Sequence, residues 1–154
     1  MKILTKDVRM NMVNLIVGPK GCGKTKKFIE LTNNAAAENP NCVVCIEKGS
    51  ISTFSVSYNA RLIDIDEFDK INTYGEFYAF LCGLISGNYD IHEIFIDAVL
   101  RICGRNMEEF CRFVIELDKF SKAHNVNFTL TVSCNRDDIP GDALEIVKDL
   151  VVLG

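Results

Sequence analysis

The residues from Gly18 to Thr25 read G-P-K-G-C-G-K-T and match the phosphate-binding pattern G-x-x-x-x-G-K-[ST] at every fixed position. The glycines allow backbone N–H groups to turn inward around phosphate oxygens, in conformations that a Cβ atom would obstruct. The Lys24 ammonium can reach the β- and γ-phosphates of a nucleotide, and the Thr25 hydroxyl can ligate Mg²⁺. We therefore expect Mg·ATP to bind along a continuous loop of nine residues: Gly18, Pro19, Lys20, Gly21, Cys22, Gly23, Lys24, Thr25 and Lys26.

The segments on either side of this loop predict the structure that its chemistry requires. Residues 12–17 form an apolar run of the length of one buried strand, and residues 25–38 carry Phe28, Leu31 and Ala35 at helical spacing. The N-terminus of the predicted helix adds unpaired N–H groups and a positive dipole end beside the loop. The combination of strand, loop and helix indicates nucleotide binding.

The rest of the chain alternates between apolar runs and helical patterns. Strands are predicted at 42–46, 61–65, 91–97, 128–134 and 150–153, with helices at 73–87, 106–120 and 143–148. An alternating pattern within residues 50–58 predicts an exposed ribbon or edge strand. The alternation of strands and helices predicts a three-layer α/β fold, with a mostly parallel sheet and helices on both faces. We expect residues 12–154 to form a single nucleotide-binding domain and residues 1–11 to be a flexible leader or extension.

Composition and charge exclude several classes of function. The formal net charge of the 154 residues is −4, which argues against non-specific binding of nucleic acid. No apolar run approaches the roughly 20 residues that a membrane-spanning helix needs. The seven cysteines are odd in number and no signal peptide precedes them, so we expect reduced thiols and a cytoplasmic location.

A phosphate loop needs a second acidic group for Mg²⁺, usually an aspartate that ends an apolar strand. Two segments compete for this role. Asp97 follows three apolar residues, whereas the segment 62–67 ends in Asp66 and Glu67 and is interrupted by Asp64. We prefer Asp97, because a central strand that flanks the loop strand should be uniformly apolar. Asp66 is then expected to cap a helix.

With Asp97 as the magnesium residue, a strand and a helix lie between the loop and the magnesium strand. This insertion resembles the RecA-like division of P-loop ATPases, which expects a glutamate to polarise the attacking water. Many members place it directly after the strand aspartate, where this chain has Ala98. RecA-type recombinases carry it at the end of the strand after the first helix, where this chain has Glu47. The resemblance implies that Lys24 and Glu47 are catalytic, with a solvated charge at a strand end as the alternative for Glu47.

The same resemblance implies a polar residue that senses the γ-phosphate after the strand at 128–134. Ser133 and Asn135 are available there, and we assign Ser133 to the nucleotide site. Arg136 is either an arginine finger acting on a neighbouring subunit or a surface arginine, and the surface role is favoured.

A closer resemblance covers residues 12 to about 140. The motifs G-P-K-G-C-G-K-T-K-K, V-V-C-I-E-K-G at 43–49, R-L-I-D-I-D-E-F at 61–68 and L-C-G-L-I-S-G-N-Y-D at 81–90 carry it. They are similar to a family of small P-loop proteins of Firmicutes-type bacteria that are often labelled "twitching motility ATPase". The resemblance implies a RecA-like domain that binds ATP and Mg²⁺. Pilus-retraction ATPases are longer, and their His- and Asp-rich boxes have no counterpart here.

Two other functions compete with a slow Mg²⁺-dependent ATPase. The order of motifs is similar to that of thymidine kinases, although this chain has Ala98 after the strand aspartate and no cysteine beyond Cys134. A nucleotide-dependent switch that acts on a protein partner is the third reading, which Ala98 favours and Glu47 opposes. The sequence leaves open whether the protein forms a homo-oligomer or binds another protein.

Overall fold

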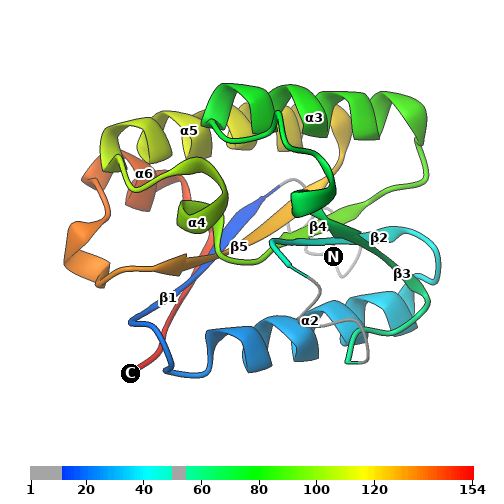
Figure 1. Cartoon of the computed structure of the whole chain (residues 1–154), viewed down its shortest axis with the longest axis horizontal. Helices are drawn as coiled ribbons and strands as arrows, with labels where there is room; N and C mark the ends of the chain where they lie inside the picture. Colours follow the sequence, from blue (N-terminus) through cyan, green and yellow to red (C-terminus); the bar gives the residue numbers. More distant parts are fainter. Residues whose placement is uncertain (1–11, 50–54) are drawn as a thin grey trace, which may run out of the picture.

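A computed structural model describes residues 12–49 and 55–154. Six strands form one sheet in the order β3-β2-β4-β5-β1-β6, and every neighbouring pair is parallel (Figure 1). The strands are β1 (Val13–Gly18), β2 (Val43–Glu47), β3 (Ala60–Asp64), β4 (Glu93–Ile96), β5 (Asn127–Ser133) and β6 (Asp149–Val152). The α-helices are α2 (Lys24–Glu38), α3 (Tyr74–Gly87), α4 (Val99–Cys103), α5 (Met107–His124) and α6 (Gly141–Ile146), and two short 3-10 helices are η1 (Ile65–Glu67) and η2 (Arg136–Asp138).

Helices cover both faces of this sheet. Figure 1 shows α3, α4, α5 and α6 on one face and α2 on the other. Apolar residues dominate the central strands, and all five residues of β2 are buried. Under α2 a small core forms around Phe28, whose ring meets the edge of the Phe95 ring at 6.1 Å between centroids. The three-layer α/β fold expected from the sequence is confirmed.

Local capping explains where the two long helices of the other face begin. The Thr73 hydroxyl accepts a hydrogen bond from the Glu76 N–H at 3.1 Å, and the Glu76 carboxylate accepts one from the Thr73 N–H at 3.0 Å. The side chain of Asn106 likewise accepts hydrogen bonds from the N–H groups of Glu108 and Glu109. These caps fix the starts of α3 and α5 at the end of the molecule where the strands finish.

The strand order corrects the expectation that the strand before Asp97 flanks the loop strand. Strand β5 lies between β1 and β4, so the strand that precedes Asp97 does not flank the loop strand. Both β5 and β4 lie between β1 and β2, so the strand that ends in Glu47 does not neighbour the loop strand either. Because all strands are parallel, their carboxyl ends nevertheless meet at one edge of the sheet.

Smaller corrections concern the segment between β2 and α3. Strand β3 lies at the edge of the sheet and not in its centre. Asp66 does not cap a helix: the Asp64 carboxylate accepts a hydrogen bond from the Asp66 N–H at 3.0 Å and caps η1 instead. Of the ribbon expected at 50–58, residues 50–54 lie outside the described residues, and residues 55–58 form turns and a bend. The leader expected at 1–11 also lies outside them.

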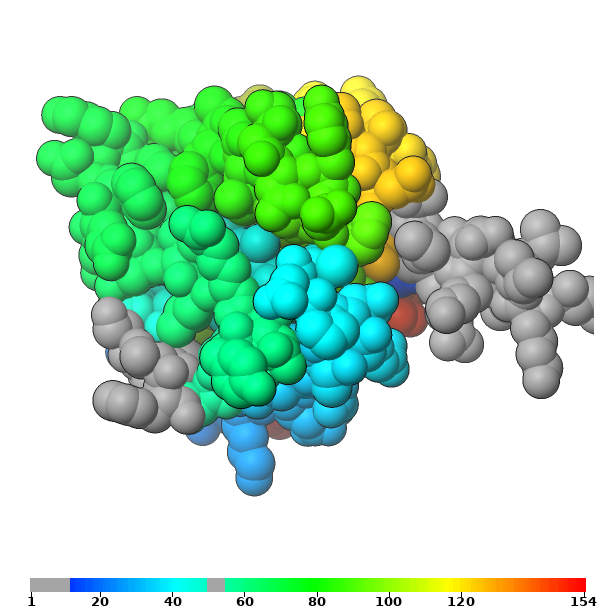
Figure 2. Space-filling view, turned by 90° about the vertical axis from the view of Figure 1, so that its right-hand side faces the viewer, coloured from blue at the N-terminus to red at the C-terminus, as the bar shows by residue number. Residues whose placement is uncertain are grey.

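Figure 2 shows the edge of the sheet where the strands begin, which lies opposite the edge with their carboxyl ends. The chain around residue 40, in cyan, and around residue 125, in gold, lie on this face, as a parallel sheet requires. Within residues 12–49 and 55–154, no helix combines the length and the apolar character needed to cross a membrane.

Candidate nucleotide-binding site

The phosphate loop leaves β1 at Gly18 and enters α2 at Lys24. Gly21 and Gly23 have φ angles of +83° and +97°, which side chains rarely permit. A Cβ atom on Gly18 would lie 2.6 Å from Cys22 Sγ and 2.6 Å from the Leu153 carbonyl oxygen, so only glycine fits there. The first turn of α2 carries no acidic residue, and its N-cap residue is a glycine. The helix therefore presents its first N–H groups to an anion without competition from a carboxylate.

Lys24 folds back over this loop. Its side-chain Nζ atom donates a hydrogen bond to the Pro19 carbonyl oxygen at 2.8 Å and lies 3.9 Å from Cys22 Sγ. The residue is only 7% exposed. The ammonium group is thus held against the loop backbone, and it adds a full positive charge to the dipole end of α2.

Three oxygen-bearing side chains meet where α2, β4 and β5 come together. The Thr25 hydroxyl donates a hydrogen bond to Asp97 Oδ2 at 3.3 Å, and the Thr131 hydroxyl donates one to Asp97 Oδ1 at 2.5 Å. The Thr131 oxygen also accepts a hydrogen bond from the Ala98 N–H at 2.6 Å. Ala98 adopts a left-handed conformation with φ +56°, so the backbone turns away immediately after the aspartate. Thr131 therefore fixes both the carboxylate of Asp97 and the turn that follows it.

The donors at this point fit Mg²⁺. A hydroxyl and a carboxylate supply hard oxygen ligands, and Mg²⁺ usually takes only one or two protein carboxylates, with phosphate and water completing its shell. Among the described residues, no group of three or more His, Cys, Asp or Glu side chains forms a metal cluster. Thr25 and Asp97 are the residues that would hold the ion.

Glu47 lies one strand beyond Asp97. The Asp97 N–H donates to the Ile46 carbonyl oxygen at 2.8 Å, which places the ends of β2 and β4 side by side. Glu47 is 2% exposed, so it is not the solvated charge that was the alternative for this position. Burial raises the pKa of the neighbouring Cys45 thiol, and the negative charges of Glu47 and Asp97 raise it further. Two carboxyl groups from adjacent strands thus act on the same buried thiol.

Ser133 and a residue that the sequence did not point to, Arg105, lie at the end of β5. Ser133 pairs in register with Gly18, the first residue of the phosphate loop. Its carbonyl oxygen accepts a hydrogen bond from Arg105 Nη2 at 2.7 Å. Arg136 begins η2 just beyond this strand and is exposed. Arg105 belongs to no motif, and Thr131 looks like an ordinary strand residue, so the sequence carried no signal for either.

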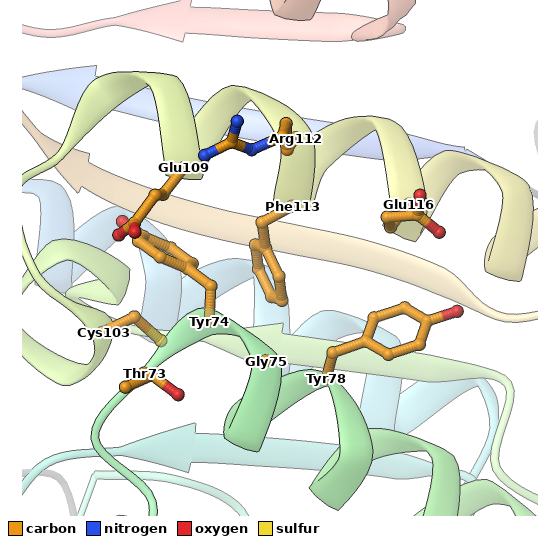
Figure 3. Close-up of a pocket in the computed structure, with 9 residues that line it drawn as sticks. All are labelled: Thr73, Tyr74, Gly75, Tyr78, Cys103, Glu109, Arg112, Phe113 and Glu116. Carbon is orange, nitrogen blue, oxygen red and sulfur yellow. The ribbon is translucent and has the colours of Figure 1, made fainter.

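A separate cavity of about 420 Å³ lies between α3 and α5, away from this loop (Figure 3). The rings of Tyr74 and Phe113 lie in it, whereas Arg112 and Glu116 point outward. No residue of the phosphate loop lines it. We assign the nucleotide site to the loop, because the anion-binding groups and the oxygen ligands gather there. At the edge of the cavity, the Tyr74 hydroxyl donates a hydrogen bond to the carbonyl oxygen of Gly104, the residue before Arg105, at 2.6 Å.

Comparison with known proteins supports the fold. No family model matches the chain, and no curated protein matches it. Among solved structures 355 chains match, so the fold is widely shared. One of them is the structure of C. elegans PCH-2, with a TM-score of 0.59 and 17% sequence identity over 97% of this chain. The match spans 37% of the PCH-2 chain, and at this identity it shows a shared fold and no specific activity.

Proposed function

We propose that this protein is a Mg²⁺-dependent ATP-binding protein of the RecA-like P-loop class and that it hydrolyses ATP slowly. One observation carries the proposal. The Thr25 hydroxyl of a complete phosphate-loop motif lies 3.3 Å from the carboxylate of Asp97, although 72 positions separate the two residues in the chain. Thr25 and Asp97, the two residues proposed to hold the metal, are therefore in hydrogen-bond contact in the folded chain.

The loop residues and Lys24 would bind the β- and γ-phosphates, and Thr25 and Asp97 would hold the metal. When bound, Mg²⁺ would neutralise charge on the phosphate oxygens. Phosphoryl transfer needs little covalent help from a protein, so positioning and electrostatics supply the catalysis. Ser133, in register with Gly18, is proposed to sense the terminal phosphate.

Glu47 is the proposed group that polarises the attacking water. Its support is its place at the end of β2, beside the end of the strand that leads to Asp97. Asp97 meets Thr25 even though β4 lies two strands from β1. The strand that carries Glu47 is the next one beyond β4, and neighbouring strands lie roughly 5 Å apart. A glutamate side chain together with one water can span about that distance.

A nucleotide-dependent switch is the second candidate. The residue after Asp97 is Ala98, which has no acidic side chain that could activate water. Its N–H donates a hydrogen bond to the Thr131 hydroxyl. The kinase alternative gains no support from the described residues. We also propose that the protein belongs to the Firmicutes family named above and that it forms a homo-oligomer or binds a protein partner.

Isothermal titration of ATP in the presence of Mg²⁺ into the parent and a Lys24→Ala variant tests the proposed function. Loss of the ammonium should weaken binding by at least about thirtyfold, because charge-assisted hydrogen bonds to phosphate contribute about 2 kcal/mol or more. Lys27→Ala is the matched control, since Lys27 is half-buried on the same helix and lies 3.7 Å from Glu30. Circular dichroism would verify the fold of both variants. Undiminished affinity in Lys24→Ala would contradict the phosphate-loop hypothesis.

A further inference from the structure

Arg105 lies in the short connection between α4 and α5, at the edge of the sheet where the strands end. Its Nη2 atom donates a hydrogen bond to the carbonyl oxygen of Ser133 at 2.7 Å. Ser133 is the last residue of β5 and pairs with Gly18, which opens the phosphate loop. The guanidinium group is therefore held next to the strand pair from which the loop emerges.

A second cation approaches the same place from the loop. The thiol of Cys134, one residue beyond Ser133, has a pKa that burial and Asp138 raise, and the charges of Arg105 and Lys24 both act in the opposite direction. The charge of Lys24, from the phosphate loop, and that of Arg105 thus both act at the end of β5. Lys24 and Arg105, which come from different segments, converge on one thiol.

Arg105 has donors to spare for an anion. The hydrogen bond to Ser133 uses one of the five N–H donors of a guanidinium group. Its side chain is exposed, so an incoming phosphate would not have to displace packed protein. The planar fork of arginine suits two parallel hydrogen bonds to phosphate oxygens.

The backbone that carries Arg105 is fixed from the other side. The hydroxyl of Tyr74 donates to the Gly104 carbonyl oxygen at 2.6 Å. The Tyr74 ring packs against Phe113 with 5.2 Å between ring centroids, and Figure 3 shows the two rings side by side. Arg105 thus extends from an ordered segment, which lowers the entropy lost when it binds a ligand.

We propose that Arg105 binds the terminal phosphate of ATP and makes the site favour a nucleoside triphosphate over a diphosphate. Lys24 would contact the phosphates from the loop, and Arg105 would contact the last one from the end of β5. This inference rests on the proposed function, because Arg105 would distinguish between nucleotides bound at the phosphate loop.

The test compares two nucleotides, a non-hydrolysable ATP analogue and ADP, each titrated with Mg²⁺ into the parent and into Arg105→Gln. Glutamine removes the charge and keeps a polar side chain at this position. The variant should bind the ATP analogue about tenfold or more weakly, the effect of one lost charge-assisted contact, and ADP less than about threefold more weakly. Arg105→Lys should fall between parent and glutamine variant. Arg101→Gln, an exposed arginine in the last turn of α4, should leave both affinities unchanged.

The possible outcomes test the role of Arg105 separately from the proposed binding of ATP. If Arg105→Gln loses affinity equally for both nucleotides, or for neither, Arg105 only braces β5 and the inference is overturned while ATP binding stands. If the parent binds neither nucleotide, the proposed function fails and the inference fails with it. Thermal melting of each variant would show that the affinities refer to folded protein.

Discussion

The Thr131 hydroxyl holds Asp97, the proposed magnesium ligand, through two hydrogen bonds that one substitution removes. Thr131 is 1% exposed, donates to Asp97 Oδ1 at 2.5 Å and accepts from the Ala98 N–H at 2.6 Å. Thr131→Val keeps the shape of the side chain and deletes the hydroxyl. It leaves one carboxylate oxygen and one backbone N–H without their protein partner.

The expected loss of stability follows from the carboxylate oxygen and the N–H group that lose their partner. An unsatisfied buried polar group costs about 1–3 kcal/mol. Asp97 and Ala98 are half-buried, so water can replace part of what is lost, and we expect a total of about 2–3 kcal/mol in the free energy of unfolding. Thr131→Ser is the matched control: it keeps the hydroxyl, loses one methyl group and should cost only about 1 kcal/mol.

Urea unfolding measures the stability, and isothermal titration of ATP with and without Mg²⁺ measures the role at the site. Thr131→Val should reduce the gain in ATP affinity that Mg²⁺ provides, with metal-free ATP affected little, because the hydroxyl acts only through Asp97. Asp97→Ala should reduce the gain in ATP affinity from Mg²⁺ even more, again with little effect on metal-free ATP. The double variant should resemble Asp97→Ala, since the two substitutions act through the same carboxylate. A Thr131→Val protein that is destabilised but keeps the full effect of Mg²⁺ would reduce Thr131 to a structural residue. A change in stability below about 0.5 kcal/mol would refute both hydrogen bonds.

Two further predictions concern hydrolysis and alkaline stability. Glu47→Gln should leave ATP affinity within a factor of about three and lower phosphate release by about a hundredfold, the usual effect of losing a general base; turnover equal to the parent would make Glu47 structural, and an inactive parent would favour the switch. Burial, aided by the charge of Glu76, raises the pKa of Cys103 from 9.0 to about 12, so its thiol ionises first in the unfolded chain. Its contribution to stability should be complete below pH about 9 and fall by about 1.4 kcal/mol per pH unit between about 9 and 12. Urea unfolding at pH 8 and pH 10.5 should show a smaller loss for Cys103→Ala than for the parent, and equal losses would count against a buried neutral thiol.

The elements of this fold could be predicted because local signals specify them. Thr73 with Glu76 and the side chain of Asn106 mark helix starts in the sequence, and both caps form in the structure. The strand order could not be predicted in the same way. Parallel strands that are covered on both faces are rich in apolar residues whatever their place in the sheet, and nothing in the residues of β5 indicates that it lies between β1 and β4.

The same distinction applies within the candidate site. Asp97 could be selected because an acidic residue that ends an apolar strand is unusual and has a chemical use. Thr131 and Arg105 could not, because a threonine is ordinary in a strand and an arginine is ordinary in a connection. Asp64 takes the capping role that was expected of Asp66, since either position suits a cap and only the backbone at η1 decides which carboxylate accepts the N–H.

The strand order also bears on the rate of hydrolysis. An acid directly after Asp97 would share its strand, whereas Glu47 comes from the next strand and is 2% exposed. A buried carboxyl can activate water only when the adjoining backbone admits that water, and the backbone here turns at Gly49, with φ +92°. The Gly49 N–H donates to Asp64 Oδ1 at 2.8 Å, which ties this turn to the end of β3. If Glu47 is the base proposed above, its burial hinders the approach of water, which is a physical reason to expect slow hydrolysis. Asp64→Ala, which frees that turn, should then change turnover more than it changes ATP affinity.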